Sequence, residues 1–215
     1  FFGDDQDITL THVADTGLTL KHANTGDDKF PTFLLATGDT DIAANDKLGV
    51  INFQAPDEGA GTDAILVAAG IEAVSEGDFS ASSNATSLVF KTGASEAAAE
   101  KMRVDSSGNV SIGSSSNHAG ARVVINRSPP TAFGSPMFQV GQETFTGSGM
   151  YSIGFGYTTS GSDNPPVEIA ALTTTDGGST KADIVFGTRS STGNVAVTER
   201  MRIDNSGNVS VGDTT

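Results

Sequence analysis

A fourteen-residue phrase occurs twice in this chain. Residues 100–113 are EKMRVDSSGNVSIG and residues 199–212 are ERMRIDNSGNVSVG, with ten of the fourteen letters identical. Weaker similarities precede both copies in the same order: FPTFLL and SPMFQV, GVINF and SIGFGY, AILVAAGI and VEIAAL. A repeat of this length predicts two tandem units of one fold, each of about a hundred residues.

Each copy of the phrase predicts a β-hairpin, because apolar and polar residues alternate on both sides of a central turn. Asp105 is placed to accept hydrogen bonds from backbone N–H groups of the turn. Gly108 is placed at the left-handed position that a three-residue hairpin with a bulge requires. Asp204 and Gly207 hold the same places in the second copy.

Residues 95–102 (SEAAAEKM) allow two interpretations. Taken alone, a serine cap followed by alanine and glutamate favours a helix. The corresponding residues 194–201 (NVAVTERM) place β-branched side chains at alternate positions, which is typical of a strand. Because repeated units are expected to share a fold, we favour a strand in both places.

The whole chain is expected to be all-β. Its short apolar segments, separated by Gly, Asn, Asp and Pro turns, indicate about seven or eight strands per unit, arranged as an antiparallel β-sandwich or β-prism. We place an opening strand pair in residues 1–29, a first unit in residues 30–113 and a second in residues 114–215. Large apolar side chains are few for a free-standing domain, so we expect strand faces to be buried against other chains.

Composition excludes several classes of function. A formal charge of −14 argues against binding to nucleic acid or to anionic membranes, both of which require lysine and arginine. The absence of cysteine excludes disulfides and thiolate metal sites. The longest apolar run, residues 64–71, is far shorter than the roughly 20 residues that cross a bilayer, so we expect no membrane insertion.

The ends of the sequence indicate a longer protein. The chain begins with Phe1 and has no signal-like segment, and residues 208–215 (NVSVGDTT) match residues 109–116 (NVSIGSSS), the point at which the second unit begins. We therefore expect a further module or a chaperone domain to follow.

Metal and cofactor sites are not expected. His12, His22 and His118 have no second ligand at metal-binding spacing nearby, so we interpret them as surface or loop residues. Three equivalent histidines that bind an ion on a trimer axis remain an alternative. The Asp- and Asn-rich residues 38–46 and 204–213 lack the EF-hand spacing, and we interpret them as Asx turns. The glycine-rich stretches lack the residues of a phosphate-binding loop, so no cofactor is expected.

No catalytic residue is predicted either. Polysaccharide-cleaving enzymes use two carboxyl groups roughly 5 to 9.5 Å apart. We interpret the acidic residues in turn-like segments as solvated turn residues rather than as such a pair; they are Asp57, Glu58, Asp63, Glu76 and Asp78.

Tyr151 and Tyr157, the only tyrosines, are weak candidates for contacts with a glycan. They share strand parity with Ile153 and Phe155, which favours a buried apolar face instead.

The repeated phrase, followed by a small-residue loop and the segment ARVVINRS at residues 121–128, resembles the recurrent module of bacteriophage tail fibre and tail spike proteins, particularly in phages of marine bacteria. Residues 7–23 resemble the strand pair that opens such units. The resemblance covers most of the chain, although only the two hairpins are specific, and no catalytic motif of the family matches. It implies a structural protein of the virion: an elongated, parallel homotrimer in the phage tail. Its implied partners are other tail proteins and a glycan or protein of the host surface.

Two further hypotheses stay open. The first is a bacterial surface adhesin or fibril subunit built from tandem β-units. The second is a tail spike that depolymerises polysaccharide in a cleft between chains.

Overall fold

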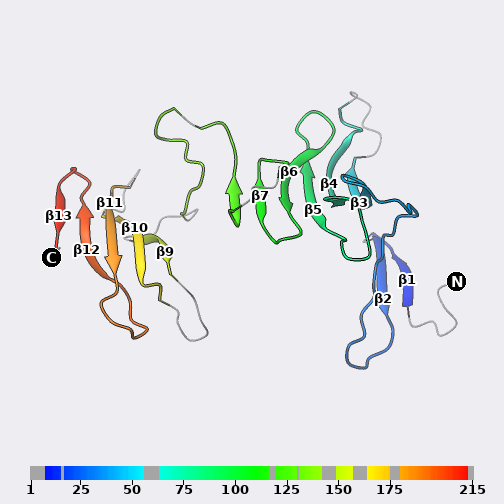
Figure 1. Ribbon diagram of the computed structural model, residues 1–215, viewed down its shortest axis with the longest axis horizontal. Coiled ribbons are helices and arrows are strands. Elements are labelled where there is room, and N and C mark those ends of the chain that lie inside the picture. Colours follow the sequence, from blue (N-terminus) through cyan, green and yellow to red (C-terminus); the bar gives the residue numbers. More distant parts are fainter. Residues whose placement is uncertain are drawn as a thin grey trace. The chain divides into compact units, whose positions relative to one another are not determined.

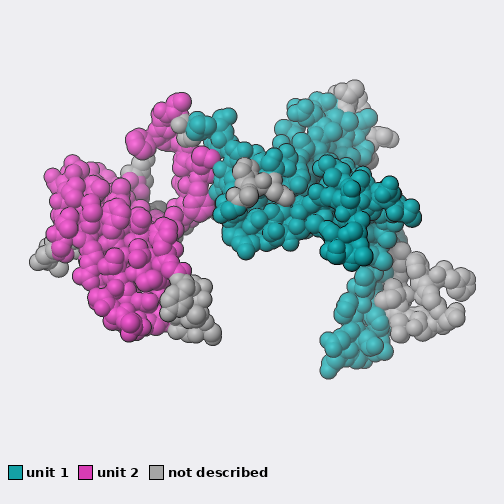
Figure 2. Space-filling view, viewed as in Figure 1, with its two compact units in different colours: residues 1–129 teal, residues 130–215 magenta. Residues whose placement is uncertain are grey.

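The computed structural model describes residues 8–15, 17–55, 63–116, 120–129, 131–141, 149–156, 164–174 and 180–212. The described residues form strands and turns without a helix, which confirms the expected all-β class. The chain divides into two compact units, residues 1–129 and residues 130–215 (Figure 2). The boundary between repeats expected after Gly113 precedes this division, and it stays a prediction.

Unit 1 contains a two-stranded and a six-stranded sheet (Figure 1). Its strands are β1 (Ile8–Val13), β2 (Gly17–His22), β3 (Lys47–Gln54), β4 (Val67–Ser75), β5 (Thr86–Thr92), β6 (Ala99–Val104), β7 (Val110–Ile112) and β8 (Val123–Ile125). β1 and β2 form an antiparallel hairpin. The larger sheet has the order β3-β4-β5-β6-β7-β8, antiparallel except for β7 and β8, which run parallel.

Unit 2 contains a five-stranded antiparallel sheet whose consecutive strands are neighbours (Figure 1). Its strands are β9 (Met150–Phe155), β10 (Val167–Thr173), β11 (Ala182–Thr188), β12 (Thr198–Ile203) and β13 (Val209–Val211). This is the strand order of β3 to β7. The irregularities in strand register also correspond. The pairing of β5 with β6 shifts register after Phe90, and the pairing of β11 with β12 shifts at the equivalent Phe186.

Residues 95–102 are strand only in their second half. Residues 94–97 form bends and β6 begins at Ala99, so the favoured strand is confirmed for residues 99–102 and the helix is absent. The N–H groups of Gly93 and Ala98 donate to the carbonyl groups of Ala68 and Val67, both at 2.8 Å. These bonds tie the loop to β4, and this pairing outweighs the local helix propensity.

The two large sheets carry matching ladders of apolar side chains on one face, which we call the apolar face. In unit 1 the ladder is Ile51, Ile71, Phe90, Met102 and Ile112, and in unit 2 it is Ile153, Ile169, Phe186, Met201 and Val211. Because side chains alternate across a strand, their sequence neighbours lie on the opposite face. That opposite face, which we call the charged face, carries Glu72 and Arg103 in unit 1 and Asp183 and Arg202 in unit 2.

Within each unit the apolar face is largely open; in unit 1 Leu35 covers its edge at Gly49, where an added Cβ would lie 2.9 Å from the Leu35 Cβ. Ile51, Ile153 and Val211 are 42%, 46% and 75% exposed, respectively. Among the described residues the buried apolar side chains are Val89, Ala98, Ala170 and Val185. Val89, Ala170 and Val185 lie on the charged face, because each is a sequence neighbour of a ladder residue.

The loop that precedes β12 covers part of the charged face of unit 2. A Cβ added to Gly187 would lie 2.6 Å from Cγ2 of Val197, so this loop packs directly on β11. Within its own unit, neither large sheet has a second sheet stacked on it among the described residues. Each large sheet is therefore a single layer within its unit, and a sandwich or prism requires another layer from outside that unit.

β8 joins the first sheet through a close backbone contact. The N–H of Val110 donates to the carbonyl of Arg122, and the N–H of Asn126 donates to the carbonyl of Ile112, both at 2.8 Å. Gly113 follows with a φ of 77°, and a Cβ on it would lie 2.1 Å from the Asn126 carbonyl oxygen. Gly212, at the same place in unit 2, has a φ of 95° and open space around it.

We expect Gly113→Ala to lower the free energy of unfolding more than Gly212→Ala does. Both variants place a Cβ on a residue with positive φ, which costs about 1 to 2 kcal/mol. Only Gly113→Ala also drives that atom into a neighbouring carbonyl. Urea denaturation monitored by far-UV circular dichroism measures the loss of unfolding free energy in both variants. Equal losses would contradict the close approach of β8 to Gly113.

Candidate functional site: hairpin turns and open apolar faces

The turn of the first hairpin is closed by one carboxylate. Asp105 Oδ1 accepts hydrogen bonds from the N–H groups of Ser107 at 2.9 Å and Asn109 at 2.8 Å. Its Oδ2 accepts from Nδ2 of Asn109 at 2.9 Å. The N–H of Gly108 donates to the Asp105 carbonyl at 2.9 Å, which closes the β-turn.

The turn of the second hairpin repeats these bonds. Asp204 Oδ1 accepts from the N–H groups of Ser206 at 2.9 Å and Asn208 at 2.8 Å, and Oδ2 accepts from Nδ2 of Asn208 at 2.8 Å. Gly108 and Gly207 have φ angles of 78° and 92° with open space around them. Glycine is therefore required at both positions because the backbone is left-handed there, and not because a neighbouring atom lies too close for a side chain.

The hydrogen bonds shift the acidity of both turn carboxylates. The backbone N–H and then the side-chain amide of Asn109 hold the pKa of Asp105 below its ordinary value. The side-chain amide and then the backbone N–H of Asn208 do the same for the pKa of Asp204. Both turns are thus built for an ionised aspartate.

An arginine on the charged face of each hairpin binds a glutamate with two parallel hydrogen bonds. Arg103 Nε and Nη2 bind Glu100 at 2.7 and 2.8 Å. Arg202 Nε and Nη2 both bind Glu199 at 2.8 Å, and its Nη1 binds Asp183 Oδ2 at 2.7 Å. The glutamate bonds are the main cause that raises the pKa of each arginine.

A second carboxylate ties each turn to its sheet, although the two units use different residues for it. In unit 1, Glu76 Oε1 accepts the N–H of Ser106 and the hydroxyl of Ser87, both at 2.7 Å. In unit 2, Asp183 Oδ1 accepts the N–H of Asn205 at 2.9 Å. Ser106 and Asn205 are the first turn residues of their hairpins, so the same backbone group is held in both.

These two carboxylates remain ionised despite burial. Burial raises the pKa of Glu76, but hydrogen bonds from Ser106 and Ser87 outweigh it and leave that pKa below its usual value. Burial likewise raises the pKa of Asp183, but the hydrogen bonds from Arg202 and Asn205 outweigh it and leave that pKa below its ordinary value. The sequence predicted Glu76 only as a solvated turn residue and gave no indication of Asp183, because no local pattern marks either role.

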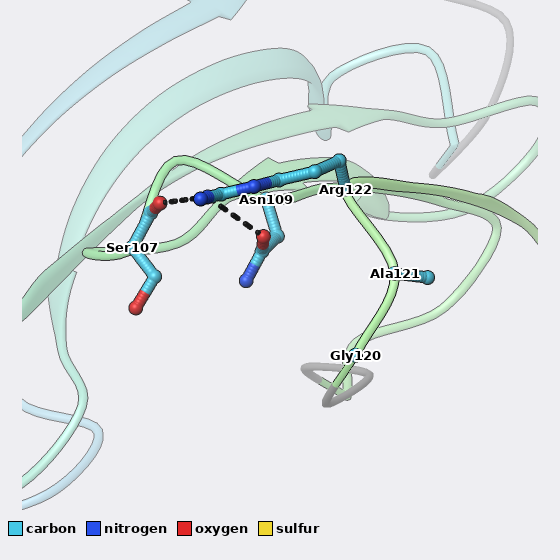
Figure 3. Close-up of a pocket in the computed structure, with 5 residues that line it drawn as sticks. All are labelled: Ser107, Asn109, Gly120, Ala121 and Arg122. Atoms are coloured by element: carbon cyan, nitrogen blue, oxygen red, sulfur yellow. Dashed lines mark hydrogen bonds between the residues drawn. The ribbon is translucent and has the colours of Figure 1, made fainter.

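Arg122 binds the first turn from the side (Figure 3). Its Nη1 donates to the carbonyl of Ser107 at 2.7 Å and to Oδ1 of Asn109 at 3.2 Å. With Gly120 and Ala121 these residues line a cavity of about 290 Å³. Arg122 thus links the turn to β8, which begins at the next residue.

Five of the eight histidine and acidic residues considered above as metal ligands or catalytic groups lie among the described residues. His12 is exposed, and the ring Nδ1 of His22 accepts the N–H of Asn24 at 3.1 Å. Asp63 and Asp78 are exposed. The described residues contain no group of three or more His, Cys, Asp or Glu side chains that could hold a metal ion. His118, Asp57 and Glu58 lie outside the described residues.

The two tyrosines have different outcomes. Tyr151 lies half-buried in β9 on the apolar face, opposite Ala171 of β10 and in line with Ile153 and Phe155. Tyr157 lies outside the described residues.

In the part of the chain that is described, no helix is long and apolar enough to cross a membrane.

Comparison with known proteins gives structural neighbours only. No protein-family model matches the chain, and no curated protein does. One similar structure is the carboxy-terminal domain of the bacteriophage T5 L-shaped tail fibre, with 15% identity, a TM-score of 0.38 and 89% of each chain covered. Another is that domain with its intra-molecular chaperone domain, at 14% identity and a TM-score of 0.38. That match covers 89% of this chain, which spans 61% of the neighbour.

Gly108→Val and Gly207→Val are each expected to lower the free energy of unfolding by about 1 to 3 kcal/mol, because a β-branched residue is forced to a positive φ. Gly77→Val is the matched control, since Gly77 also has open space but its φ lies outside that region. Thermal and urea denaturation measure all three. An unchanged melting temperature in both hairpin variants would contradict the turn geometry.

Acid is expected to destabilise the hairpins. The folded-state pKa values of Asp105 and Asp204 are lowered, so their stabilisation is complete above the unfolded value, about 3.9, and is lost as pH falls through the folded values. The double variant Asp105→Asn, Asp204→Asn should melt at a lower temperature at neutral pH and lose less on acidification. Melting temperatures between about pH 7 and pH 2 test this expectation. Parallel curves for the two proteins would refute it.

Proposed function

We propose that this chain is a segment of a trimeric bacteriophage tail fibre that gives the virion reach and attachment to the host surface. The observation that carries the proposal is the open apolar face of each large sheet, with the same ladder in both units. The hairpin phrase, which resembles the module of tail fibres and tail spikes, directs the choice of protein class.

Burial of the apolar faces supplies the driving force for assembly. A fully buried Val, Leu, Ile or Phe side chain gains about 1.5 to 3 kcal/mol over an exposed one. Ile51, Phe53, Ile153 and Phe155 are between 42% and 55% exposed in the single chain, so much of this gain is unrealised. Three parallel copies with apolar faces toward a shared axis bury these ladders and supply the missing layer of a prism.

The same arrangement directs the charged faces and loops outward. Glu72, which is 6% exposed, is paired with Lys47 at 2.9 Å and Lys91 at 2.8 Å, so the ionic groups there are already satisfied within one chain. Attachment to a host glycan or protein then falls to the exposed loops. Tyr151 packs between chains in this assembly and does not contact a glycan.

We propose no catalytic activity for the chain. Of the acidic candidates, Glu76 holds the first hairpin turn through Ser106. A depolymerase would release oligosaccharides from a capsule, and an adhesin built as a string of single-chain units would be monomeric. The oligomeric state therefore separates the fibre from the adhesin.

The intact particle is expected to have the mass of three chains and a hydrodynamic radius too large for a compact sphere of that mass. Size-exclusion chromatography with light scattering measures both quantities. Ile153→Asp, on the apolar face, should reduce the mass to that of one chain, because it places a charge in the interface. A compact monomer in the parent protein would overturn the trimer and favour the adhesin.

Ser152→Asp is the matched control for that experiment. It adds the same charge at the neighbouring position of β9, but on the opposite face, and Ser152 is exposed. It should remain a trimer. Dissociation by both variants, or by neither, would mean that the apolar face is not the interface.

A further inference from the structure

The outer edge of β7 shows how this hairpin receives a neighbouring strand. β8 lies parallel to β7, with Val123 opposite Val110 and Ile125 opposite Ile112, and the backbone groups of Val110 and Ile112 bind it. Gly113 lets the backbone of Asn126 approach closely. Each feature lies within the hairpin phrase or in the strand that it receives.

The turn supplies a further contact to the incoming strand. The carbonyl oxygen of Ser107 and Oδ1 of Asn109 accept hydrogen bonds from Arg122, which directly precedes β8. The positive charge of Arg122 also contributes to the lowered pKa of Asp105. The turn thus recognises the arginine by two oxygen acceptors beside an ionised carboxylate.

The groups of the first hairpin that receive β8 recur in the second hairpin. Val209 and Val211 pair with β12 in the register that Val110 and Ile112 adopt with β6. The N–H of Gly212 donates to the Arg200 carbonyl at 2.9 Å, as Gly113 does to Lys101 at 2.8 Å.

The turn acceptors of the second hairpin correspond as well. Ser206 and Asn208 occupy the places of Ser107 and Asn109, and Asp204 holds them by the same bonds as Asp105. The second hairpin therefore has the acceptor groups, the glycine and the strand edge that bind β8 in unit 1.

The outer edge of β13 is unpaired among the described strands. Val209 and Val211 are 58% and 75% exposed, compared with 39% for Ile112 beside β8. Gly212 has open space where Gly113 meets Asn126. An exposed strand edge with apolar side chains is a template for pairing with a further strand.

We propose that residues 204–212 form an acceptor for one further parallel β-strand that has an arginine directly before its first paired residue. The occupant is the opening strand of an adjoining module of the same repeat, with the chemistry of residues 122–126 (RVVIN). β8 of a second copy does not serve, because it is already paired with β7 of its own chain. The inference goes beyond the fibre proposal, since it holds for modules of a fibre or of an adhesin.

The test uses the whole chain and a labelled peptide with the sequence of residues 120–127, GARVVINR. Fluorescence anisotropy measures binding, and hydrogen–deuterium exchange with mass spectrometry measures protection. Exchange in residues 208–212 should slow when the peptide binds, whereas residues 109–113, already paired with β8, should be unchanged. A peptide with alanine in place of the first arginine should bind about tenfold or more weakly, because a charge-assisted contact is lost.

Two variants of one residue provide the matched control. Val211→Pro removes the outward N–H of β13 and should abolish peptide binding, since proline cannot donate to a strand. Val211→Ile keeps that N–H and supplies the side chain that Ile112 has at the same place in unit 1, so it should bind the peptide. Proline is tolerated on edge strands, and unchanged protection of residues 199–203 would show that β12 is intact.

Three outcomes would overturn the proposal. The first is unchanged hydrogen exchange in residues 208–212 at a peptide concentration of about 1 mM. The second is equal affinity for the arginine and alanine peptides. The third is full protection of residues 208–212 without peptide, because a second copy of the chain covers them. None of them changes the expected trimer mass or the effect of Ile153→Asp, so failure here is distinguishable from failure of the fibre proposal.

Discussion

A sheet with one apolar face is stable in water only when that face is covered, and this constraint governs the whole chain. Unit 2 covers part of its charged face with its own loop, since Val197 packs on Gly187. Neither unit covers the whole of its apolar face with its own described residues. Leu35 lies against Gly49 in unit 1, but Ile51 and Ile153 are still 42% and 46% exposed. Folding and assembly are therefore expected to be coupled, as in oligomers that lack a stable folded monomer.

The hairpins could be predicted because their stabilising contacts are local. The carboxylate of Asp105 binds groups at positions two and four residues further along, and the same spacing recurs at Asp204. Alternation of apolar residues then gave the strands on both sides. The composition of residues 95–98 favours a helix only when it is considered alone. Hydrogen bonds from Gly93 and Ala98 to the first two residues of β4 determine the conformation of that loop.

Contacts between distant residues left no comparable signal. The parallel pairing of β8 with β7 depends on how the chain returns after the hairpin, which alternation does not specify. Strand parity placed Tyr151 with Ile153 and Phe155, but it does not reveal whether a second layer belongs to the same chain. Glu76 was noticed only as an acidic turn residue, since its bond to Ser106 spans thirty residues.

The two carboxylates that hold the turns also bear on how such chains diverge. Asp183 occupies the strand position of Ser87, and in unit 1 the negative oxygen arrives instead from Glu76, beyond the end of β4. Both units keep a carboxylate oxygen that accepts the N–H of the first turn residue. The residue that supplies this oxygen comes from a different position in the chain in each unit. Mutational drift can pass through an intermediate that has both acids and then lose either one. Related proteins can therefore keep the same turn structure while the residues that stabilise the turn change position. Common ancestry can then be recognised from the structure when it can no longer be recognised from the sequence.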